Sequence, residues 1–175
     1  MLLYRRIRYG YGFRRIRLTQ GKYAIVDADD YWELAKYSWY AHKAENSYYA
    51  GRTVHMAKSK KTRIVWMHRE VICVPAGLMC DHINHDGLDN RKVNLRAATA
   101  AQNRFNSRTA RIRKSSKYRG VCWRADHKKW FAYVYVGGRA VFMKYFDDAT
   151  AAARARDRAA KKYHGQFAEL NFPDE

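Results

Sequence analysis

The sequence predicts an α+β protein of two small folded parts joined by a basic linker. Three observations predict it. Residues 14–106 alternate short β-branched and aromatic runs with short helical patterns, which is typical of small mixed domains. Residues 107–116 are basic and lack an apolar period, as linkers do, although they would also suit one or two further helical turns. Residues 117–173 carry three aromatic runs and then one alanine-rich helix.

The charge balance is strongly basic. The chain of 175 residues has 35 Lys and Arg against 16 Asp and Glu, a formal net charge of +19. Such a field attracts polyanions, so nucleic acid is the expected partner and an anionic membrane surface is the alternative. No apolar run reaches the roughly 18 residues of a membrane span, and the N-terminus lacks the apolar core of a signal peptide. The protein is therefore expected to remain in the cytoplasm.

The three cysteines give no sign of a disulfide framework. Their number is odd, and the spacing of Cys73 and Cys80 is unlike that of a zinc-binding pair. Together with Cys122 they are expected to be reduced thiols that pack as small apolar side chains.

The first part is expected to begin with a basic arm, residues 1–13, followed by an N-terminal α+β region over residues 14–65. A tight turn is expected at Gln20-Gly21 and a short helix in DADDYWELAKY. The expected strands are RRIRL, KYAIV, WYAHKA, YYAGRTV and TRIVWMH.

A second section, residues 66–106, ends in CDHINHDGLDNRKVNLRAATAAQNRFN, a stretch dense in carboxylate, imidazole and carboxamide groups. Met79–His82 is expected to end a strand. Asp86-Gly87 is expected to turn the chain, and Asn94-Leu95 to return as a second short strand. The prediction is a β-hairpin followed by a helix.

That helix is expected to begin at Thr99, because Thr99 and Gln102 form a capping box. Asn103 then lies on its first turn. Hydrolysis of a phosphodiester needs a metal that neutralises the phosphate, a base that activates water and a group that orients the base. Asp81 and an Asn oxygen suit a partial shell around a hard divalent ion, and His82 titrates near neutrality. Turn-forming residues without a metal are the alternative for Asp81 and His82.

The order of these residues resembles the HNH, or ββα-metal, nucleases, in particular the phage-type homing endonucleases. MHRE, residues 67–70, also resembles a recurrent lead-in to the motif, in which His68 and Arg69 are expected to pack or to contact phosphate. The matching residues, in three groups along the chain, are Asp81, His82, Ile83, Asn84, Asp86 and Gly87, then Asn90, Asn94, Leu95 and Arg96, and last Asn103 and Asn106.

The resemblance implies roles for four residues. Asp81 and Asn103 would hold one divalent ion, expected to be Mg²⁺ with Mn²⁺ as the alternative. His82 would be the general base, and Asn94 would hydrogen-bond His82 and orient it. No small-molecule cofactor besides the metal is expected.

The second part, residues 117–173, is expected to form three strands, in YRGVCWR, KWFAYVYV and RAVFMKYF. Gly137-Gly138 suits a tight hairpin between the last two. A helix follows, with Asp148 as the expected N-cap and Gly165 as its stop. Its small alanines would let it lie close against the sheet.

This part resembles the AP2 DNA-binding domain over nearly its full length. The resemblance implies a three-stranded antiparallel sheet packed on one helix, with the free face of the sheet in the major groove of DNA. The matching residues are YRGV (118–121), KWFA (129–132), Phe146, the alanine-rich helix, Gly165 and LNFP (170–173).

The period of two along a strand assigns the faces of this sheet. Val121, Ala132 and Val134 are expected to face the helix, and Trp130 to lie either in the core or against a sugar. Cys122 is one of several departures from residues common in plant members, so the base preference of those proteins is not carried over. The residues expected on or near the DNA face are Arg119, Arg124, Tyr133, Tyr135 and Arg139.

The sequence thus predicts a metal-dependent, site-specific DNA endonuclease of the HNH homing type. It would act on double-stranded DNA as a monomer or weak dimer, in the cytoplasm of a bacterial or phage-infected cell. The alternative is a non-catalytic DNA-binding protein or regulator that uses the AP2-like sheet. An RNA-binding protein is a third possibility, because basic and aromatic surfaces also suit RNA.

Overall fold

The structure is a computed structural model that describes residues 12–45, 47–56, 61–107 and 115–174. Most of the expected basic arm and of the expected linker therefore lies outside the described residues. All three cysteines are free thiols, as predicted.

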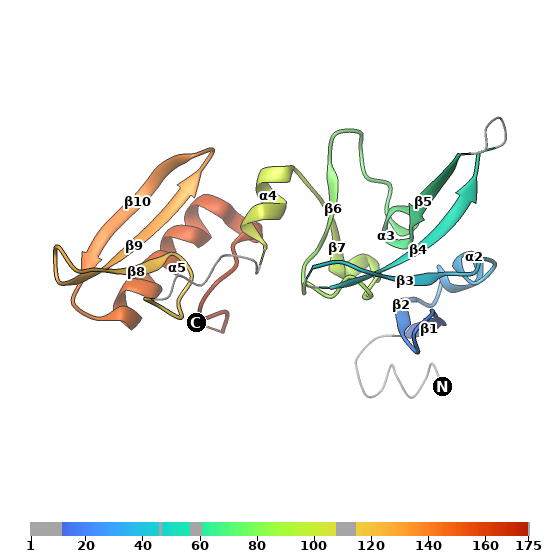
Figure 1. Cartoon of the computed structure of the whole chain (residues 1–175), viewed down its shortest axis with the longest axis horizontal. Helices are drawn as coiled ribbons and strands as arrows, with labels where there is room; N and C mark the ends of the chain where they lie inside the picture. Colours follow the sequence, from blue (N-terminus) through green and yellow to red (C-terminus); the bar gives the residue numbers. More distant parts are fainter. Residues whose placement is uncertain (1–11, 46, 57–60, 108–114, 175) are drawn as a thin grey trace. The chain divides into compact units, whose positions relative to one another are not determined.

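The chain divides into two compact units, Met1–Thr99 and Ala100–Glu175, whose elements are labelled in Figure 1. Each unit combines strands and helices, which confirms the α+β class. Within the described residues, no helix is both long and apolar enough to span a bilayer.

Two small antiparallel sheets form much of the first unit. In one, β1 (Phe13–Arg17) pairs with β2 (Tyr23–Asp27). Their connection contains Gln20 and Gly21 at φ of 58° and 66°, so the predicted turn is confirmed. In the other sheet, the strand order is β3 (Tyr40–Lys43), β4 (Tyr48–His55) and β5 (Thr62–Trp66).

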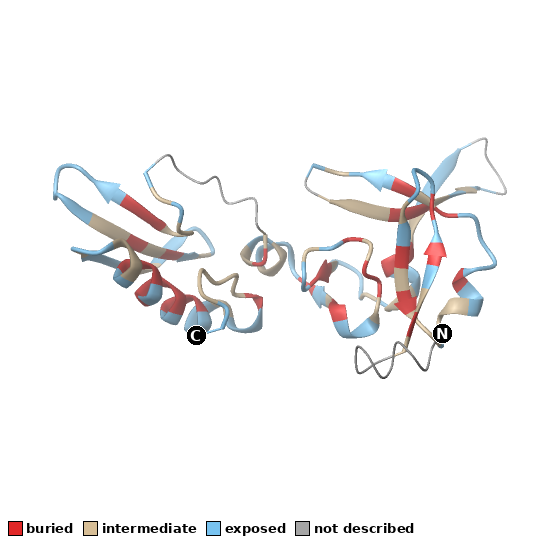
Figure 2. Ribbon diagram, turned by 90° about the horizontal axis from the view of Figure 1, so that it is seen from below, coloured by how far each residue is buried: buried red, intermediate tan, exposed pale blue. Residues whose placement is uncertain are grey.

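The core of the first unit gathers buried side chains from both sheets and from two short helices (Figure 2). Helix α2 (Tyr31–Leu34) contributes Leu34. The indole N–H of Trp39 donates to the carbonyl of Leu34 at 2.7 Å, which satisfies a polar group inside the core. The buried residues of this core are Ile16, Leu18, Ala24, Val26, Leu34, Trp39, Ala41, Ala50 and Met67.

Helix α3 (Met67–Val71) stands where the sequence predicted that a strand would continue through Met67 and His68. That prediction was wrong. Met67 is fully buried and Val71 packs against the same core. Residues four apart lie on one face of a helix about 6 Å from each other, so both side chains reach the same core, whereas along a strand they would be about 13 Å apart. The backbone is still extended at Trp66, so the chain changes conformation at Met67, and His68 is buried with it.

The predicted hairpin is present. Strand β6 (Met79–His82) pairs antiparallel with β7 (Leu95–Ala98), and Asp81 lies opposite Arg96. A 3-10 turn, η1 (Lys92–Asn94), precedes β7, so the return strand begins at the second of the two residues predicted.

Helix α4 (Ala100–Phe105) follows Thr99 directly. It begins one residue later than predicted and carries Asn103 in its first turn. The order strand, strand, helix therefore agrees with the prediction, and α4 belongs to the second compact unit.

The second unit is a three-stranded antiparallel sheet packed on one helix. Strand β9 (Lys129–Val136) lies between β8 (Val121–Arg124) and β10 (Arg139–Phe146). Helix α5 (Ala149–His164) follows, and η2 (Gly165–Phe167) ends it.

The local signals of the second unit are confirmed. Gly137 and Gly138 both have positive φ, at 57° and 81°, between β9 and β10. The Asp148 carboxylate accepts the Ala151 N–H at 2.7 Å and so caps α5. Gly165 ends the helix with φ of 57°.

The core of this unit lies between α5 and one face of the sheet. Val121 and Ala132 pack with alanines of α5, and Val134 packs with two more. Trp130 packs against the same cluster, which decides between its two predicted positions in favour of the core.

A buried polar cluster, called here the Asp157 clamp, ties the C-terminal segment to α5. The Asp157 carboxylate accepts hydrogen bonds from the backbone N–H groups of Asn171 and Phe172, at 2.6 and 3.0 Å. It also accepts the Asn171 side-chain amide and the Arg156 guanidinium, both at 3.0 Å. Asn171 in turn accepts the N–H of Arg119 at 2.7 Å.

Candidate nuclease centre and DNA-binding surface

The loop between β6 and β7 is held in shape by its own polar side chains. Asn84 accepts the N–H of Asp86, and Asp86 accepts the N–H of Leu88, each at 2.9 Å. Asp89 is buried and pairs with Arg91, with 2.6 Å between Oδ1 and Nε. A loop with this many internal bonds fixes the end of β6, where Asp81 and His82 lie.

The same loop packs closely on β4. A Cβ on Gly87 would lie 2.5 Å from the Tyr48 carbonyl oxygen and 2.6 Å from the Tyr49 ring. Only glycine allows so close an approach, and it brings the Tyr49 ring beside the loop.

Asp81 is 4% exposed and carries an ion pair. Its Oδ2 accepts a hydrogen bond from Nε of Arg96 at 2.7 Å, across the ladder between β6 and β7. Both side chains are nearly buried. Because an isolated buried charge is costly, the Arg96 guanidinium compensates for the burial of the Asp81 side chain.

His82 is 6% exposed and contacts two other rings. The His68 ring is 5.2 Å away between centroids at an interplanar angle of 90°, and the Tyr49 ring is 5.7 Å away. Burial lowers the pKa of His82, while the neighbouring Asn90 side chain and the charge of Asp81 act in the opposite direction. The imidazole is therefore neutral at pH 7, which is the form that accepts a proton.

Asn94 braces the loop. Its carboxamide oxygen accepts the N–H of Asn84 at 2.9 Å, and its amide donates to the carbonyl of Asp89 at 2.8 Å. Both hydrogen bonds of this side chain go to loop backbone, whereas the resemblance implied a bond to His82.

Asn90, a residue of the motif expected to stabilise the loop rather than to take part in catalysis, is the carboxamide beside His82. It is completely buried. Its N–H donates to the carbonyl of Ile25 at 2.7 Å and its amide to that of Leu88 at 3.2 Å. Its place in the motif was the only sequence signal of this position.

Two further rings of the centre, Tyr49 and His68, were not predicted as part of it. Burial lowers the pKa of His68 to about 3, and His82 and Arg69 act in the same direction. Burial also raises the pKa of Tyr49, with Asp81 adding to the effect. These rings come from β4 and α3, far from β6 in sequence, so no local pattern could reveal the contact.

The donors of this centre fit a hard divalent ion. Among the described residues, no three His, Cys, Asp or Glu side chains are grouped so as to hold a metal. Mg²⁺ commonly takes only one or two protein carboxylates and completes its shell with water and phosphate. A single carboxylate, Asp81, beside an imidazole suits that chemistry better than a zinc site. Asn103, the second implied ligand, lies on α4 in the second unit.

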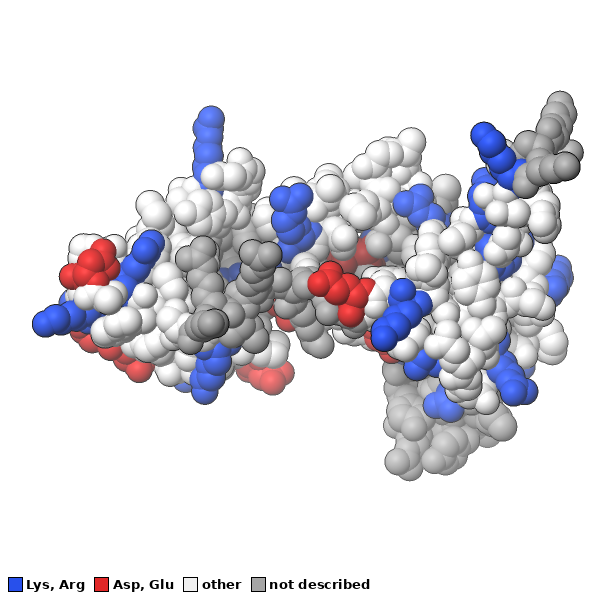
Figure 3. All heavy atoms as spheres, viewed as in Figure 1, with Lys and Arg blue, Asp and Glu red and all other residues white. Residues whose placement is uncertain are grey.

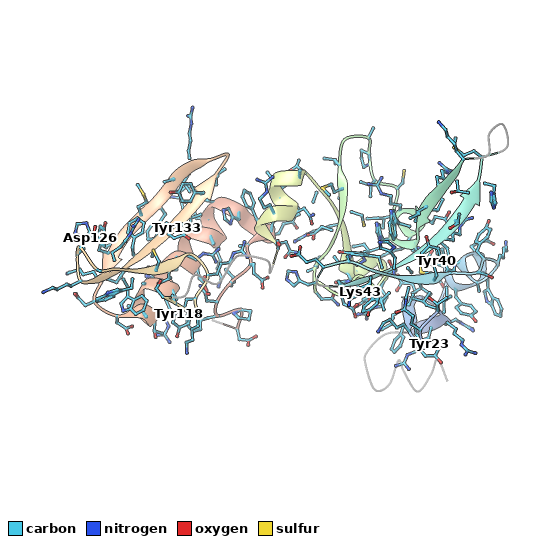
Figure 4. The ribbon with its side chains drawn as sticks, in the orientation of Figure 1. Tyr23, Tyr40, Lys43, Tyr118, Asp126 and Tyr133 are labelled. Atoms are coloured by element: carbon cyan, nitrogen blue, oxygen red, sulfur yellow. The ribbon has the colours of Figure 1, made fainter. Side chains whose placement is uncertain are left out.

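The sheet of the second unit has an aromatic face opposite α5, formed by Phe131, Tyr133, Tyr135 and Tyr145; Tyr133 is labelled in Figure 4. Neighbouring rings are in contact, with centroids 4.9 Å apart for Phe131 and Tyr145 and 5.6 Å apart for Tyr133 and Tyr135. The Arg124 guanidinium lies over Phe131 at 5.3 Å. Of the five predicted DNA-face residues, the structure thus brings together Arg124, Tyr133 and Tyr135.

Arg119 and Arg139 lie elsewhere. The Arg119 guanidinium donates to the backbone carbonyls of Phe105, at 3.3 Å, and Ser107, at the C-terminal end of α4, and burial lowers its pKa. Arg139 is exposed but pairs with Val136 across the ladder. Because cross-strand partners share a face, this pairing puts Arg139 on the α5 side of the sheet.

Positive charge is present on both units. In the view of Figure 3, Lys and Arg side chains project from each unit, and fewer acidic side chains are visible. This distribution agrees with the net charge of +19 and with a polyanionic partner.

Comparison with known proteins identifies the segment around the nuclease centre. The family model described as HNH endonuclease matches residues 60–105. An uncharacterized HNH endonuclease of Acanthamoeba polyphaga mimivirus is 28% identical over 155 residues, which cover 89% of this chain and 78% of that protein.

Plant proteins match a shorter stretch. An AP2-like ethylene-responsive transcription factor of Arabidopsis thaliana is 46% identical over 59 residues, and an APETALA2-like protein of Oryza sativa is 44% identical over 59 residues. These matches cover 34% of this chain but only 12% and 14% of the plant proteins. No solved structure matches the chain. The chain therefore contains a segment, residues 60–105, that matches the HNH endonuclease model, and a segment similar to the plant AP2-like proteins.

Proposed function

We propose that the protein is a metal-dependent, site-specific DNA endonuclease of the HNH homing type. The observation that carries the proposal is the buried pair of Asp81 and His82 at the end of β6, inside the segment that matches the HNH endonuclease model. Burying a carboxylate and an imidazole side by side is costly, and groups with shifted pKa values gather at functional sites. A protein that only binds DNA has no need of this pair.

His82 is the proposed general base. It takes a proton from the water that attacks phosphorus, while the bond from phosphorus to the leaving sugar oxygen breaks. Its lowered pKa keeps the ring ready for that proton. The Asn90 side chain lies beside the ring, and Asn94 acts on it through the loop that it braces.

Asp81 and Asn103 are the residues proposed to hold the divalent ion, Mg²⁺ first and Mn²⁺ as the alternative. When bound, such an ion neutralises the charge that develops on the phosphate. Asp81 already has Arg96 as a counter-ion, so the carboxylate would be shared between two cations.

Double-stranded DNA is the proposed substrate, and the AP2-like unit is proposed to supply affinity and register. The plant relatives named as transcription factors support this partner. Tyr133, Tyr135 and Arg124 would meet sugars, phosphates and base edges from the aromatic face. Arg139 at the start of β10, and Arg119 from its place at the end of α4, would add phosphate contacts.

A non-catalytic DNA-binding protein or regulator is the second candidate, because a plant match is named a transcription factor. One experiment separates the two. Supercoiled plasmid is incubated with the full chain and Mg²⁺, with EDTA, and with two variants, His82→Ala and His55→Ala. His55 is an exposed histidine of β4 and serves as the matched control.

The endonuclease proposal expects nicking or linearisation with Mg²⁺ and none with EDTA. His82→Ala should cleave at least about 100-fold more slowly while binding DNA normally, and His55→Ala should cleave like the wild type. Retained DNA binding without any cleavage would favour the second candidate. Cleavage that survives His82→Ala would assign the base to another residue.

A further inference from the structure

His68 is a buried imidazole in contact with the nuclease centre. It lies on α3 with 9% of its surface exposed. Its ring is stacked with Trp66 at 6.3 Å and 4°, and it meets Tyr49 at 5.9 Å and His82 at 5.2 Å. Its backbone carbonyl also faces the Cys80 thiol of β6 at 4.0 Å, so α3 is linked to the strand that carries His82.

An imidazole at this position lowers the stability of the fold. The Nδ1 atom of His68 is buried and has no hydrogen-bond partner among the described residues. Burial lowers the pKa of the ring to about 3, so the ring is neutral at pH 7. A phenylalanine of similar shape would fill the same space without an unsatisfied nitrogen. Residues that cost stability in this way are typical of functional centres.

We propose that His68 is a positioning residue for His82, and that its imidazole, not merely a ring of that size, holds His82 in the orientation in which it accepts a proton. The inference rests on the proposed role of His82.

The geometry supports it in two ways. The rings are perpendicular, so the edge of one meets the face of the other, and a polar N–H edge binds a ring face more strongly than a C–H edge does. Tyr49 contacts both rings, with centroids 5.7 Å from His82 and 5.9 Å from His68, so the three rings form a compact triangle. His82 cannot tilt toward either neighbour without displacing it, and a small misplacement of a base costs much of the rate.

Three variants of the full chain test the proposal. His68→Phe keeps the ring and removes the nitrogens, and His68→Ala removes both. The matched control is His42→Phe, because His42 also meets Trp66 at 5.2 Å but is exposed. The measurements are thermal unfolding, DNA affinity, the single-turnover cleavage rate on plasmid with Mg²⁺, and the ring ¹⁵N and ¹H resonances of His82 in metal-free protein.

His68→Phe is expected to melt no lower than the wild type and to bind DNA within about twofold, yet to cleave about tenfold more slowly and to shift the His82 resonances. His68→Ala should lose more, and His42→Phe should match the wild type. A folded His68→Phe that cleaves at the wild-type rate with unchanged His82 resonances would overturn the proposal. A wild type that does not cleave would remove the endonuclease function, but a shift of the His82 resonances in His68→Phe would still support the positioning contact.

Discussion

The two units both bury polar side chains, but they satisfy them differently. In the Asp157 clamp of the second unit, one carboxylate accepts four hydrogen bonds. In the nuclease centre, the His68 imidazole is also buried, but its Nδ1 has no hydrogen-bond partner among the described residues. A carboxylate that accepts four hydrogen bonds stabilises a fold, whereas a buried nitrogen without one, such as His68 Nδ1 or Nε of Arg156 in the clamp, lowers its stability. The comparison separates a structural polar cluster from a functional one.

The largest effect is expected from breaking the clamp. Asp157→Ala leaves Arg156 buried without its anion and removes the acceptor of the C-terminal segment, so the second unit should lose about 3–5 kcal/mol of unfolding free energy. Chemical denaturation followed by circular dichroism measures this. Asp148→Ala, which removes only the cap of α5, should cost about 1 kcal/mol. Equal losses for the two variants would contradict the importance of the clamp.

Acid is expected to lower the unfolding free energy of the first unit, because His68 is protonated more readily in the unfolded chain. The pKa of this ring falls from 6.5 to about 3 on folding, so the unfolded chain binds a proton in this range that the folded unit does not. The unfolding free energy should therefore decline as pH falls below about 6.5, by about 1.4 kcal/mol per pH unit at most, until about pH 3. Denaturation curves at several pH values measure the slope.

His68→Phe is the control for that slope, because it removes the titrating ring and keeps its shape. His164 of the second unit also has a pKa lowered by burial, so the difference between wild type and His68→Phe isolates the part due to His68. A slope that is unchanged in His68→Phe would show that another group is responsible.

Asn94 tests whether a polar side chain of the nuclease centre stabilises the first unit, as the Asp157 clamp stabilises the second. Asn94→Ala leaves the N–H of Asn84 and the carbonyl of Asp89 unsatisfied, and should cost the first unit about 2 kcal/mol. Urea denaturation and the cleavage rate, measured on the same sample, test this. A variant that keeps full stability but loses cleavage would mean that Asn94 acts on His82 directly, as the resemblance implied.

The smallest effect is expected on the aromatic face. Tyr135 is 48% exposed there, so Tyr135→Ala should leave stability nearly unchanged and weaken DNA binding by about 1 kcal/mol, or roughly fivefold. Fluorescence anisotropy at one fixed salt concentration measures it. Tyr163→Ala on α5, where the tyrosine is 41% exposed, is the matched control. Equal affinities of the two variants would argue against this face as the DNA surface.

The sequence predicted a feature well when the residues that form it lie close together along the chain. The Asp148 cap, the Gly165 stop and the Gly137-Gly138 hairpin are confirmed, because each depends on neighbours a few residues apart. The side of the sheet that faces α5 was equally predictable from the period of two, and Val121 and Val134 pack as expected.

The remaining features depend on contacts between distant segments. Met67 and His68 were wrongly predicted as strand residues because the β-branched residues before them favour a strand, and only packing against the core decides that α3 forms. The meeting of Tyr49, His68 and His82 joins three elements with no local signature. The roles of Asp81, His82, Asn94 and Asn103 remain predictions, which the proposed variants test.

The attachment of α4 matters for anyone who wishes to retarget this protein. Arg119 binds the last carbonyls of the helix, Phe105 stacks on His164 at 3.8 Å, and His164 is hydrogen-bonded with the carbonyl of Tyr135 at 3.1 Å. A chimera that exchanges residues 117–173 for another DNA-binding domain would therefore remove Arg119, which donates to the end of α4, and His164, which stacks on Phe105. The graft would have to bring an equivalent arginine and ring, or Asn103 would be carried on a helix whose end frays.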